Sequence, residues 1–345
     1  MYDTRESENI IDIFGNVIKL IEVSRVTQTV LAVDLGGTKI LVGEVTEDGQ
    51  VLSSQKYPSN VTSMQAAAEK IKEAITDFLS HQTIKGQLIG IGVCVVGRVN
   101  TETGEWFEIR PGLSEPTSLA DELAEQFQLP CWLTNDVSGA ALAENMLGKG
   151  RETQNFVYIN IGTGIAGRVI TDGRLIVGGH SNAGEVGHMV VDMNSEDRCL
   201  CGRQGCVELF SSGLGMHNQM VKFAAEYPDT CLPINTSERV PFYELVLAYE
   251  KNDPLAKRVV NQALKAAAAL TMNLVRVSDP EAVVFGGGVM NDGWFLNHLV
   301  TLLNEKTIRF VTKGFSVTEL DPNVVALKGA AALVFINQKG ERKDA

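Results

Sequence analysis

The most chemically dense stretch of the sequence runs from Ala183 to Gly213 and reads AGEVGHMVVDMNSEDRCLCGRQGCVELFSSG. Within it, His188, Cys199, Cys201 and Cys206 follow the spacing H-x10-C-x-C-x4-C. One imidazole and three thiolates are the Cys₃His ligand set of a closed structural zinc site. The spacing therefore predicts a structural Zn²⁺, with a set of free thiols as the alternative.

Glu185 and Glu208 stand on either side of this cysteine cluster. A charged residue between glycine-rich loops is usually solvated surface, but carboxylates can also bind the hydroxyls of a sugar through paired hydrogen bonds. One ring nitrogen of His188 can hold a metal while the other faces a bound sugar. Four protein ligands leave a zinc ion no open position, so we expect the metal to hold the pocket and to do no chemistry itself.

Asn135 and Asp136 lie where a short strand pattern meets an alanine-rich helix pattern. Both residue types are favoured there simply as N-caps. Phosphoryl transfer to a sugar hydroxyl, however, requires a carboxylate within hydrogen-bond reach of the acceptor oxygen. We predict that Asp136 is this general base and that Asn135 holds an adjacent hydroxyl.

Three glycine-rich turns have the composition of phosphate-binding loops, because glycine lets backbone N–H groups approach a phosphate. Any one of them could be an ordinary turn, but two occur at matching positions in similar units and a third is expected to open a helix. Together they predict a nucleotide cradle, in which Asp34 could orient a Mg²⁺-bound water. The predicted nucleotide-binding residues are Asp34, Gly36, Gly37, Thr38, Lys39, Gly162, Thr163, Gly164, Gly286, Gly287 and Gly288.

The elements around these turns indicate a duplicated fold. The segment TVLAVDLGGTKILVGEVTEDGQVLSSQKY predicts three antiparallel strands, followed by a helix from Ser63 to about Ser80 and a buried strand. This order differs from the alternating units of a dinucleotide-binding fold. NFVYINIGTGIAGRVITDGRLIVG repeats the same pattern about 125 residues later. We therefore expect an α/β protein with the two-domain fold of the actin-like, ribonuclease H-like ATPases, with nucleotide and sugar in the cleft between the domains.

The predicted domains are discontinuous. Residues 30–134 and the C-terminal helix, 326–345, form a small domain, and residues 135–325 form a large domain with the metal site. The first 29 residues carry isoleucine, valine and leucine at roughly helical spacing, which predicts a helical arm packed on the body or on a partner subunit. A remnant of a DNA-binding segment is the weaker alternative, because one short helix does not make a helix-turn-helix.

Composition narrows the range of partners. The chain has 345 residues, of which 44% are hydrophobic, and a formal net charge of −12. This negative charge disfavours nucleic acid or an anionic membrane as a partner, because both are themselves negatively charged. The six cysteines are not evenly spaced, and the N-terminus is too charged for a signal peptide. We expect a cytoplasmic protein that binds small molecules.

The motifs DLGGTK, IGTGI, AGEVGH, CLCGRQGCVE and VVFGGG, together with ND before an alanine-rich helix, resemble those of the ROK family of sugar kinases and sugar-responsive repressors. The resemblance implies Asp136 as the catalytic base and ATP with Mg²⁺ between two domains. It also implies a dimer, or a multiple of one. The implied zinc ligands are His188, Cys199, Cys201 and Cys206, and the implied sugar contacts are Asn135, Glu185, His188 and Glu208, to which we add Gly97.

The chain departs from the family pattern at three places. The expected loop GVCVVGRVN, 92–100, replaces a loop sequence like GVPGPVD, and the expected loop IRPGL, 109–113, replaces one like SPNL. Arg168 stands where glycine is common, and on a strand it would either point outward or touch a phosphate. The first two segments flank the expected sugar pocket, so the choice of sugar stays open.

Together these features predict an ATP-dependent kinase that phosphorylates a hexose, most simply glucose at O6. A sugar-sensing regulator without turnover is the first alternative, and a zinc-stabilised interaction protein with an inactive site is the second. The intact DLGGTK turn, preceded by only a short arm, favours the kinase.

Overall fold

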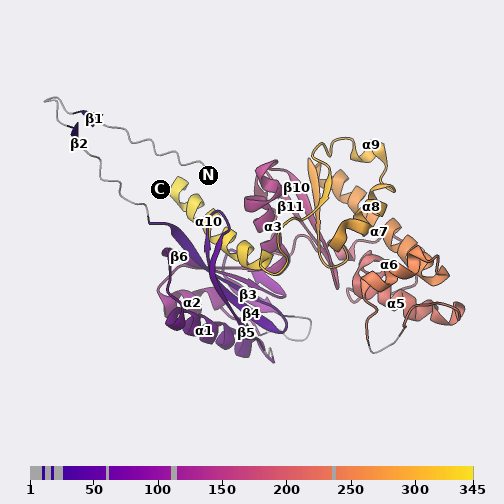
Figure 1. The fold of residues 1–345 in the computed structure, drawn as a ribbon, viewed down its shortest axis with the longest axis horizontal. Helices are drawn as coiled ribbons and strands as arrows, with labels where there is room; N and C mark the ends of the chain where they lie inside the picture. The colour runs from indigo at the N-terminus through magenta and orange to yellow at the C-terminus, as the bar shows by residue number, and fades with distance from the viewer. Residues whose placement is uncertain are drawn as a thin grey trace.

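The computed structural model describes Ile10–Ile11, Val17–Ile18 and residues 26–59, 62–109, 115–234 and 238–344. Two lobes are each built on a five-stranded sheet (Figure 1). The first sheet has the strand order β5-β4-β3-β6-β9 and the second has the order β12-β11-β10-β13-β14. In each sheet the first three strands along the chain are antiparallel, and the last two add in parallel. The predicted duplication is confirmed.

The strands of the first sheet are β3 (Gln28–Leu35), β4 (Lys39–Thr46), β5 (Val51–Pro58), β6 (Gln87–Val95) and β9 (Cys131–Asn135). Those of the second are β10 (Phe156–Ile161), β11 (Ile165–Thr171), β12 (Arg174–Leu175), β13 (Ala282–Gly286) and β14 (Phe315–Val317). The glycine turns join β3 to β4 and β10 to β11, so they occupy the same place in the two lobes.

Helices cover both faces of the first sheet. Leu31 and Val33 of β3 pack with α1 (Met64–His81) and α2 (Leu119–Phe127), whereas Val30 and Ala32 pack with α10 (Val325–Asp344). This alternation follows from the two-residue period of a strand. Figure 1 shows α10 on the opposite side of the sheet from α1 and α2. The C-terminal helix therefore completes the N-terminal lobe.

One helix packs against both lobes. On the second sheet, Val157 and Ile159 face α5 (Gly213–Phe223) and α7 (Pro254–Ser278), while Phe156 and Tyr158 face α3 (Asp136–Leu147). The same α3 follows directly from β9 of the first sheet and packs along α10. Asp136, its first residue, is therefore held between the lobes.

The other α-helices and strands are short. They are β7 (Arg98–Asn100), β8 (Glu105–Glu108), α4 (Glu208–Ser211), α6 (Phe242–Glu250), α8 (Trp294–Val300) and α9 (Glu305–Ile308). Among the helices that the structure describes, none is long and apolar enough to cross a membrane.

Three sequence predictions need correction. In the expected helical arm, Ile10–Ile11 (β1) and Val17–Ile18 (β2) instead form antiparallel strands, as suits β-branched side chains. The remainder of residues 1–25 lies outside the described part.

The triple glycine does not open an α-helix. The next α-helix, α8, begins only at Trp294, because Asp292 and Gly293 adopt left-handed φ angles of 64° and 74° that interrupt a helical backbone.

The segment 92–100 is largely strand, since Gly92 to Val95 belong to β6 and Arg98 to Asn100 form β7. In the other unusual segment, 109–113, only Ile109 belongs to the described residues.

Candidate active site and metal site

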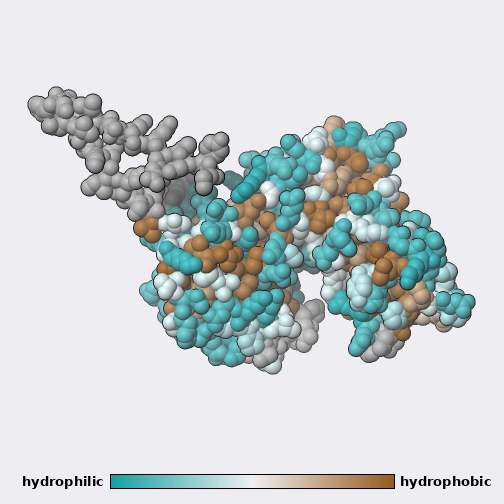
Figure 2. Space-filling model, in the orientation of Figure 1, coloured by the Kyte–Doolittle hydropathy of each residue, from teal (hydrophilic) through white to brown (hydrophobic). Residues whose placement is uncertain are grey.

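A cavity of about 300 Å³ lies between the two lobes. Four residues predicted from the sequence line it: Asp34, Gly36, Asp136 and Gly287. Figure 2 shows the molecule hollowed between its lobes. The fold thus brings the first glycine turn, the triple glycine and the proposed base to one space.

Several residues of this lining were not predicted from the sequence, including Tyr158, Asn160 and Thr318. Tyr158 and Thr318 belong to no motif and carried no signal. Asn160 had one, because it stands two residues before Gly162, just as Asp34 stands two residues before Gly36. Alignment of the two repeats would have identified it.

Asp34 and Asp136 interact electrostatically. Burial and the neighbouring Asp136 carboxylate raise the pKa of Asp34 to about 6, although Lys39 opposes the effect. Asp136 itself is accessible from the cleft but has protein on most sides. Burial therefore raises its pKa, against the hydrogen bond from the Val137 N–H and the charge of Arg168. Asp34 thus titrates closer to neutral pH than an ordinary carboxyl group, and the raised pKa of Asp136 makes it a stronger base.

Asn135 is the N-cap of α3, as the simpler interpretation of this position predicted. Its Oδ1 accepts a hydrogen bond of 2.7 Å from the Ser138 N–H. The cap uses the side-chain oxygen, so the NH₂ group is the part of Asn135 that could donate to a sugar hydroxyl.

Glu208 lies against the second glycine turn. Its Oε2 accepts a 2.8 Å hydrogen bond from the Ile165 N–H. A Cβ on Gly164 would lie 2.7 Å from the same oxygen, and one on Gly187 would lie 3.2 Å from it. Glycine at both positions therefore makes room for the carboxylate, which connects the turn to the segment that carries Glu185 and His188.

The triple glycine lies beside this same turn. Gly287 has a φ of 91°, and a Cβ there would lie 2.4 Å from the Ile161 oxygen and 2.9 Å from the Gly162 nitrogen. Arg239, which sequence analysis missed, donates a 3.0 Å hydrogen bond to the Thr163 hydroxyl. It belongs to no motif, so no sequence signal marked it.

The structure brings the four predicted metal ligands together. The ligand atoms of His188, Cys199, Cys201 and Cys206 all lie within 4.8 Å of one another. The sulfurs of Cys201 and Cys206 are 3.6 Å apart, and Cys199 Sγ is 3.4 Å from His188 Nδ1. Tetrahedral ligands at Zn–S and Zn–N bond lengths of about 2.3 and 2.0 Å would be about 3.5 to 3.8 Å apart. The donor set and its spacing therefore fit zinc.

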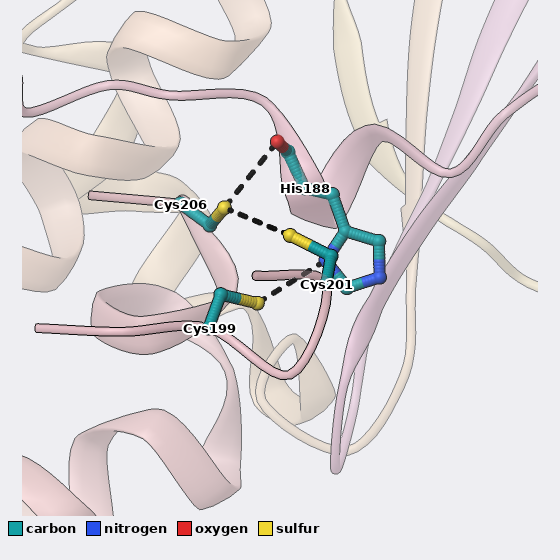
Figure 3. A group of neighbouring side chains, drawn as sticks. All are labelled: His188, Cys199, Cys201 and Cys206. Carbon is teal, nitrogen blue, oxygen red and sulfur yellow. Dashed lines mark hydrogen bonds between the residues drawn. The ribbon is translucent and has the colours of Figure 1, made fainter. Parts of the chain in front are cut away.

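The imidazole of His188 presents Nδ1 to this cluster. Figure 3 shows the second ring nitrogen directed away from the three sulfurs. Cys206 Sγ also lies 3.4 Å from the His188 carbonyl oxygen, which fixes the backbone of this segment against the cluster. The orientation agrees with the predicted double use of His188.

Among the described residues, the 300 Å³ cavity is not lined by Gly97, Glu185, His188 or Glu208. Gly97 has a φ of 89° and packs against the carbonyl of Glu108.

The prediction for Arg168, that it points outward or touches a phosphate, was wrong. Arg168 is buried, and its charge interacts with Glu185 and Asp136.

A family model described as the ROK family matches residues 30–335. The chain belongs to the ROK family. Among its ROK relatives, the glucokinase of Halalkalibacterium halodurans is 29% identical over 267 residues, which cover 76% of this chain and 81% of that protein. The DNA-binding transcriptional dual regulator NagC of Escherichia coli is 25% identical over 290 residues, covering 83% of this chain and 70% of that protein.

Comparison with solved structures agrees with the family. The crystal structure of the ROK hexokinase from Thermus thermophilus matches with a TM-score of 0.74 at 27% identity, covering 90% of this chain and 99% of that chain. The predicted two-domain actin-like fold is confirmed. ROK proteins of similar sequence thus include both kinases and regulators, and the choice between them depends on the site.

Proposed function

We propose that this ROK protein is an ATP-dependent hexose kinase, with glucose as the first sugar to test and O6 as the acceptor. The observation that carries the proposal is the shared cavity of Asp34, Gly36, Asp136 and Gly287. This cavity brings together a carboxylate that could act as a base and two glycine-rich turns whose backbone N–H groups could bind phosphate.

In the proposed reaction, Asp136 accepts the proton of the sugar hydroxyl. The hydroxyl oxygen bonds to the γ-phosphorus of ATP, the bond between that phosphorus and the β,γ-bridging oxygen breaks, and ADP leaves with the electron pair. A carboxylate whose pKa is raised by burial is a stronger base than an exposed one. Asn135 would donate to a neighbouring hydroxyl, and Glu185, His188 and Glu208 would bind the rest of the ring.

The two glycine turns would bind the nucleotide phosphates through backbone N–H groups, with Lys39 and Arg239 as the cations near them. Mg²⁺, when bound, would neutralise charge on the phosphates, and Asp34 is the carboxylate placed to orient one of its waters. The raised pKa of Asp34, about 6, fits a group that gains from a nearby cation.

We further propose that the metal on His188, Cys199, Cys201 and Cys206 is one structural Zn²⁺. These four residues would complete its coordination. The ion would order the segment between the second phosphate turn and Glu208, and would take no part in the reaction. A cytoplasmic location and a dimer, or a multiple of one, also remain predictions.

The similarity to NagC supports a second candidate, a sugar-sensing regulator without turnover. The two candidates differ at the phosphate turns. Here Gly36 N–H donates a 2.9 Å hydrogen bond to the Lys39 oxygen, so the first turn is closed and intact. An intact turn beside Asp136 favours the kinase.

A coupled assay of ADP release over a panel of hexoses and acetamido hexoses tests the proposal. We expect turnover with at least one sugar, and its loss in the variant Asp136→Asn with little change in thermal stability. Sugar binding without turnover on any sugar would refute the kinase and support the regulator. A wild-type rate in Asp136→Asn would refute Asp136 as the base.

A further inference from the structure

Arg168 is a buried cation in the middle of β11. Only 4% of the residue is exposed. Its neighbours Gly167 and Val169 face the α5 and α7 side of the sheet, so Arg168 faces the opposite side, where α3 packs. An uncompensated charge in such a place costs several kcal/mol. Its presence therefore calls for specific partners.

The first partner is the helix that carries Asp136. Arg168 Nε donates a 2.7 Å hydrogen bond to the hydroxyl of Ser138, which is itself buried. Ser138 lies in the first turn of α3, two residues after Asp136. Arg168 Nη1 also donates to the Gly167 carbonyl at 2.7 Å, which fixes the direction of the guanidinium. The side chain is thus tied to the helix end that presents the proposed base.

The second partner is the segment that carries Glu185. Gly167 N–H donates a 2.8 Å hydrogen bond to the oxygen of Gly184. A Cβ on Gly184 would lie only 2.3 Å from Arg168 Nη1, and the φ of 99° there suits glycine. The backbone directly before Glu185 therefore packs on the guanidinium, with no side chain between them.

The charges agree with this placement. Burial lowers the pKa of the Arg168 guanidinium, and the carboxylates of Glu185 and Asp136 oppose that effect. Asp34 adds a third carboxylate near Asp136. Asp136 and Glu185 carry the same charge, and the buried cation of Arg168, which interacts with both, offsets part of their cost.

We propose that Arg168 is a positioning residue: it clamps the first turn of α3 to the Gly184–Glu185 segment, and so holds the base and a sugar-binding carboxylate at a fixed separation. The inference rests on the proposed kinase activity for the role of Asp136, but the role toward Glu185 requires only that a sugar binds. Arg168 touches neither sugar nor phosphate in this proposal.

The test compares Arg168→Met, Arg168→Lys and Ser138→Ala with the wild type. Misplacing a reacting group by about 1 Å can cost about 100-fold in rate. We expect Arg168→Met to lose about 100-fold in kcat/KM for the sugar, through both kcat and KM, with the KM for ATP changed less than about twofold. Arg168→Lys keeps the charge but not the planar fork, so it should recover part of the loss.

Ser138→Ala removes one hydrogen bond and leaves the charge, so we expect a smaller loss, of about tenfold or less. The double variant Arg168→Met with Ser138→Ala should then lose little more than Arg168→Met alone, because both act through one contact. Thermal unfolding and zinc content are measured for every variant. If Arg168→Met does not fold, Arg168→Lys and Ser138→Ala decide the question.

Two results would overturn the proposal: a wild-type kcat and sugar KM in Arg168→Met, or equal losses toward sugar and ATP. Direct sugar binding by calorimetry separates this failure from failure of the kinase proposal. If the wild type binds a sugar without turnover, Arg168→Met should still weaken binding about tenfold through Glu185. Unchanged binding would refute the clamp.

Discussion

Replacing Asp34 by asparagine should stabilise the protein while abolishing its activity. The pKa of Asp34 is raised from 3.8 to about 6, chiefly by burial and the charge of Asp136. Between these values the native state binds the proton more tightly than the unfolded state, so native stability falls as pH rises. At 1.36 kcal/mol per pKa unit, the ionised carboxylate costs about 3 kcal/mol above about pH 6. Asparagine cannot ionise and avoids this cost.

Urea unfolding measures the effect. We expect Asp34→Asn to raise the free energy of unfolding by up to about 3 kcal/mol at about pH 8, by about half as much at about pH 5, and by almost nothing below about pH 3. The ADP-release assay should show loss of turnover in the same variant, because the proposed role of Asp34, orienting a Mg²⁺-bound water at the phosphates, requires a carboxylate. The carboxylate of Asp34 would then lower the stability of the protein while being required for its activity.

Asp48→Asn is a control of opposite sign. The hydroxyl of Thr46 donates to the Asp48 carboxylate and lowers the pKa of that group, which is exposed and far from the cleft. Its variant should be slightly less stable than the wild type at neutral pH, with the difference vanishing in acid, and fully active. If Asp34→Asn is no more stable than the wild type at about pH 8, burial and the Asp136 charge do not penalise the ionised Asp34 carboxylate.

Three further results are expected. A strong chelator should remove about one equivalent of zinc per chain and lower the thermal midpoint, and purified protein with less than about a tenth of an equivalent would contradict a structural zinc. Gly164→Ala should displace the Glu208 carboxylate, which lies 2.7 Å from the new Cβ, and raise the sugar KM about tenfold, whereas Gly179→Ala, with open space around it, should not. Arg239→Met should raise the KM for ATP about tenfold and leave the sugar KM unchanged, with the exposed Arg309→Met as a neutral control; equal effects of the two arginine variants would argue against a phosphate role.

Local spacing predicted the Cys₃His cluster and both glycine turns. Candidate ligands such as Cys199 and Cys201 are close in sequence, so their chemistry can be recognised without knowing the fold. The duplication was also visible, because the DLGGTK and IGTGI units share one order of strands and turns. The pairing of both sheets in the same strand order follows from that repeat.

Other features depend on contacts that no local pattern contains. The alternation of side chains along a strand places Arg168 and Tyr158 on one face of the sheet. That face is buried only because α3 packs over it, and no local pattern predicts this packing. The isoleucine-rich arm fits helical and strand periods almost equally over so short a run, and its pairing at Ile10 and Ile11 was not foreseen. The triple glycine is separated from α8 by the left-handed backbone at Asp292.

The hydrogen bond from the Ile165 N–H to Glu208 has a thermodynamic consequence. One oxygen of the carboxylate is held by the second glycine turn, which is proposed to bind the nucleotide, and the group as a whole is a proposed sugar contact. A sugar that forms hydrogen bonds with this carboxylate would change the geometry of the turn, and a phosphate bound to the turn would change the position of the carboxylate. Because binding free energies are reciprocal, the factor by which sugar changes the affinity for ATP must equal the factor by which ATP changes the affinity for sugar. The two substrates would then bind as a coupled pair.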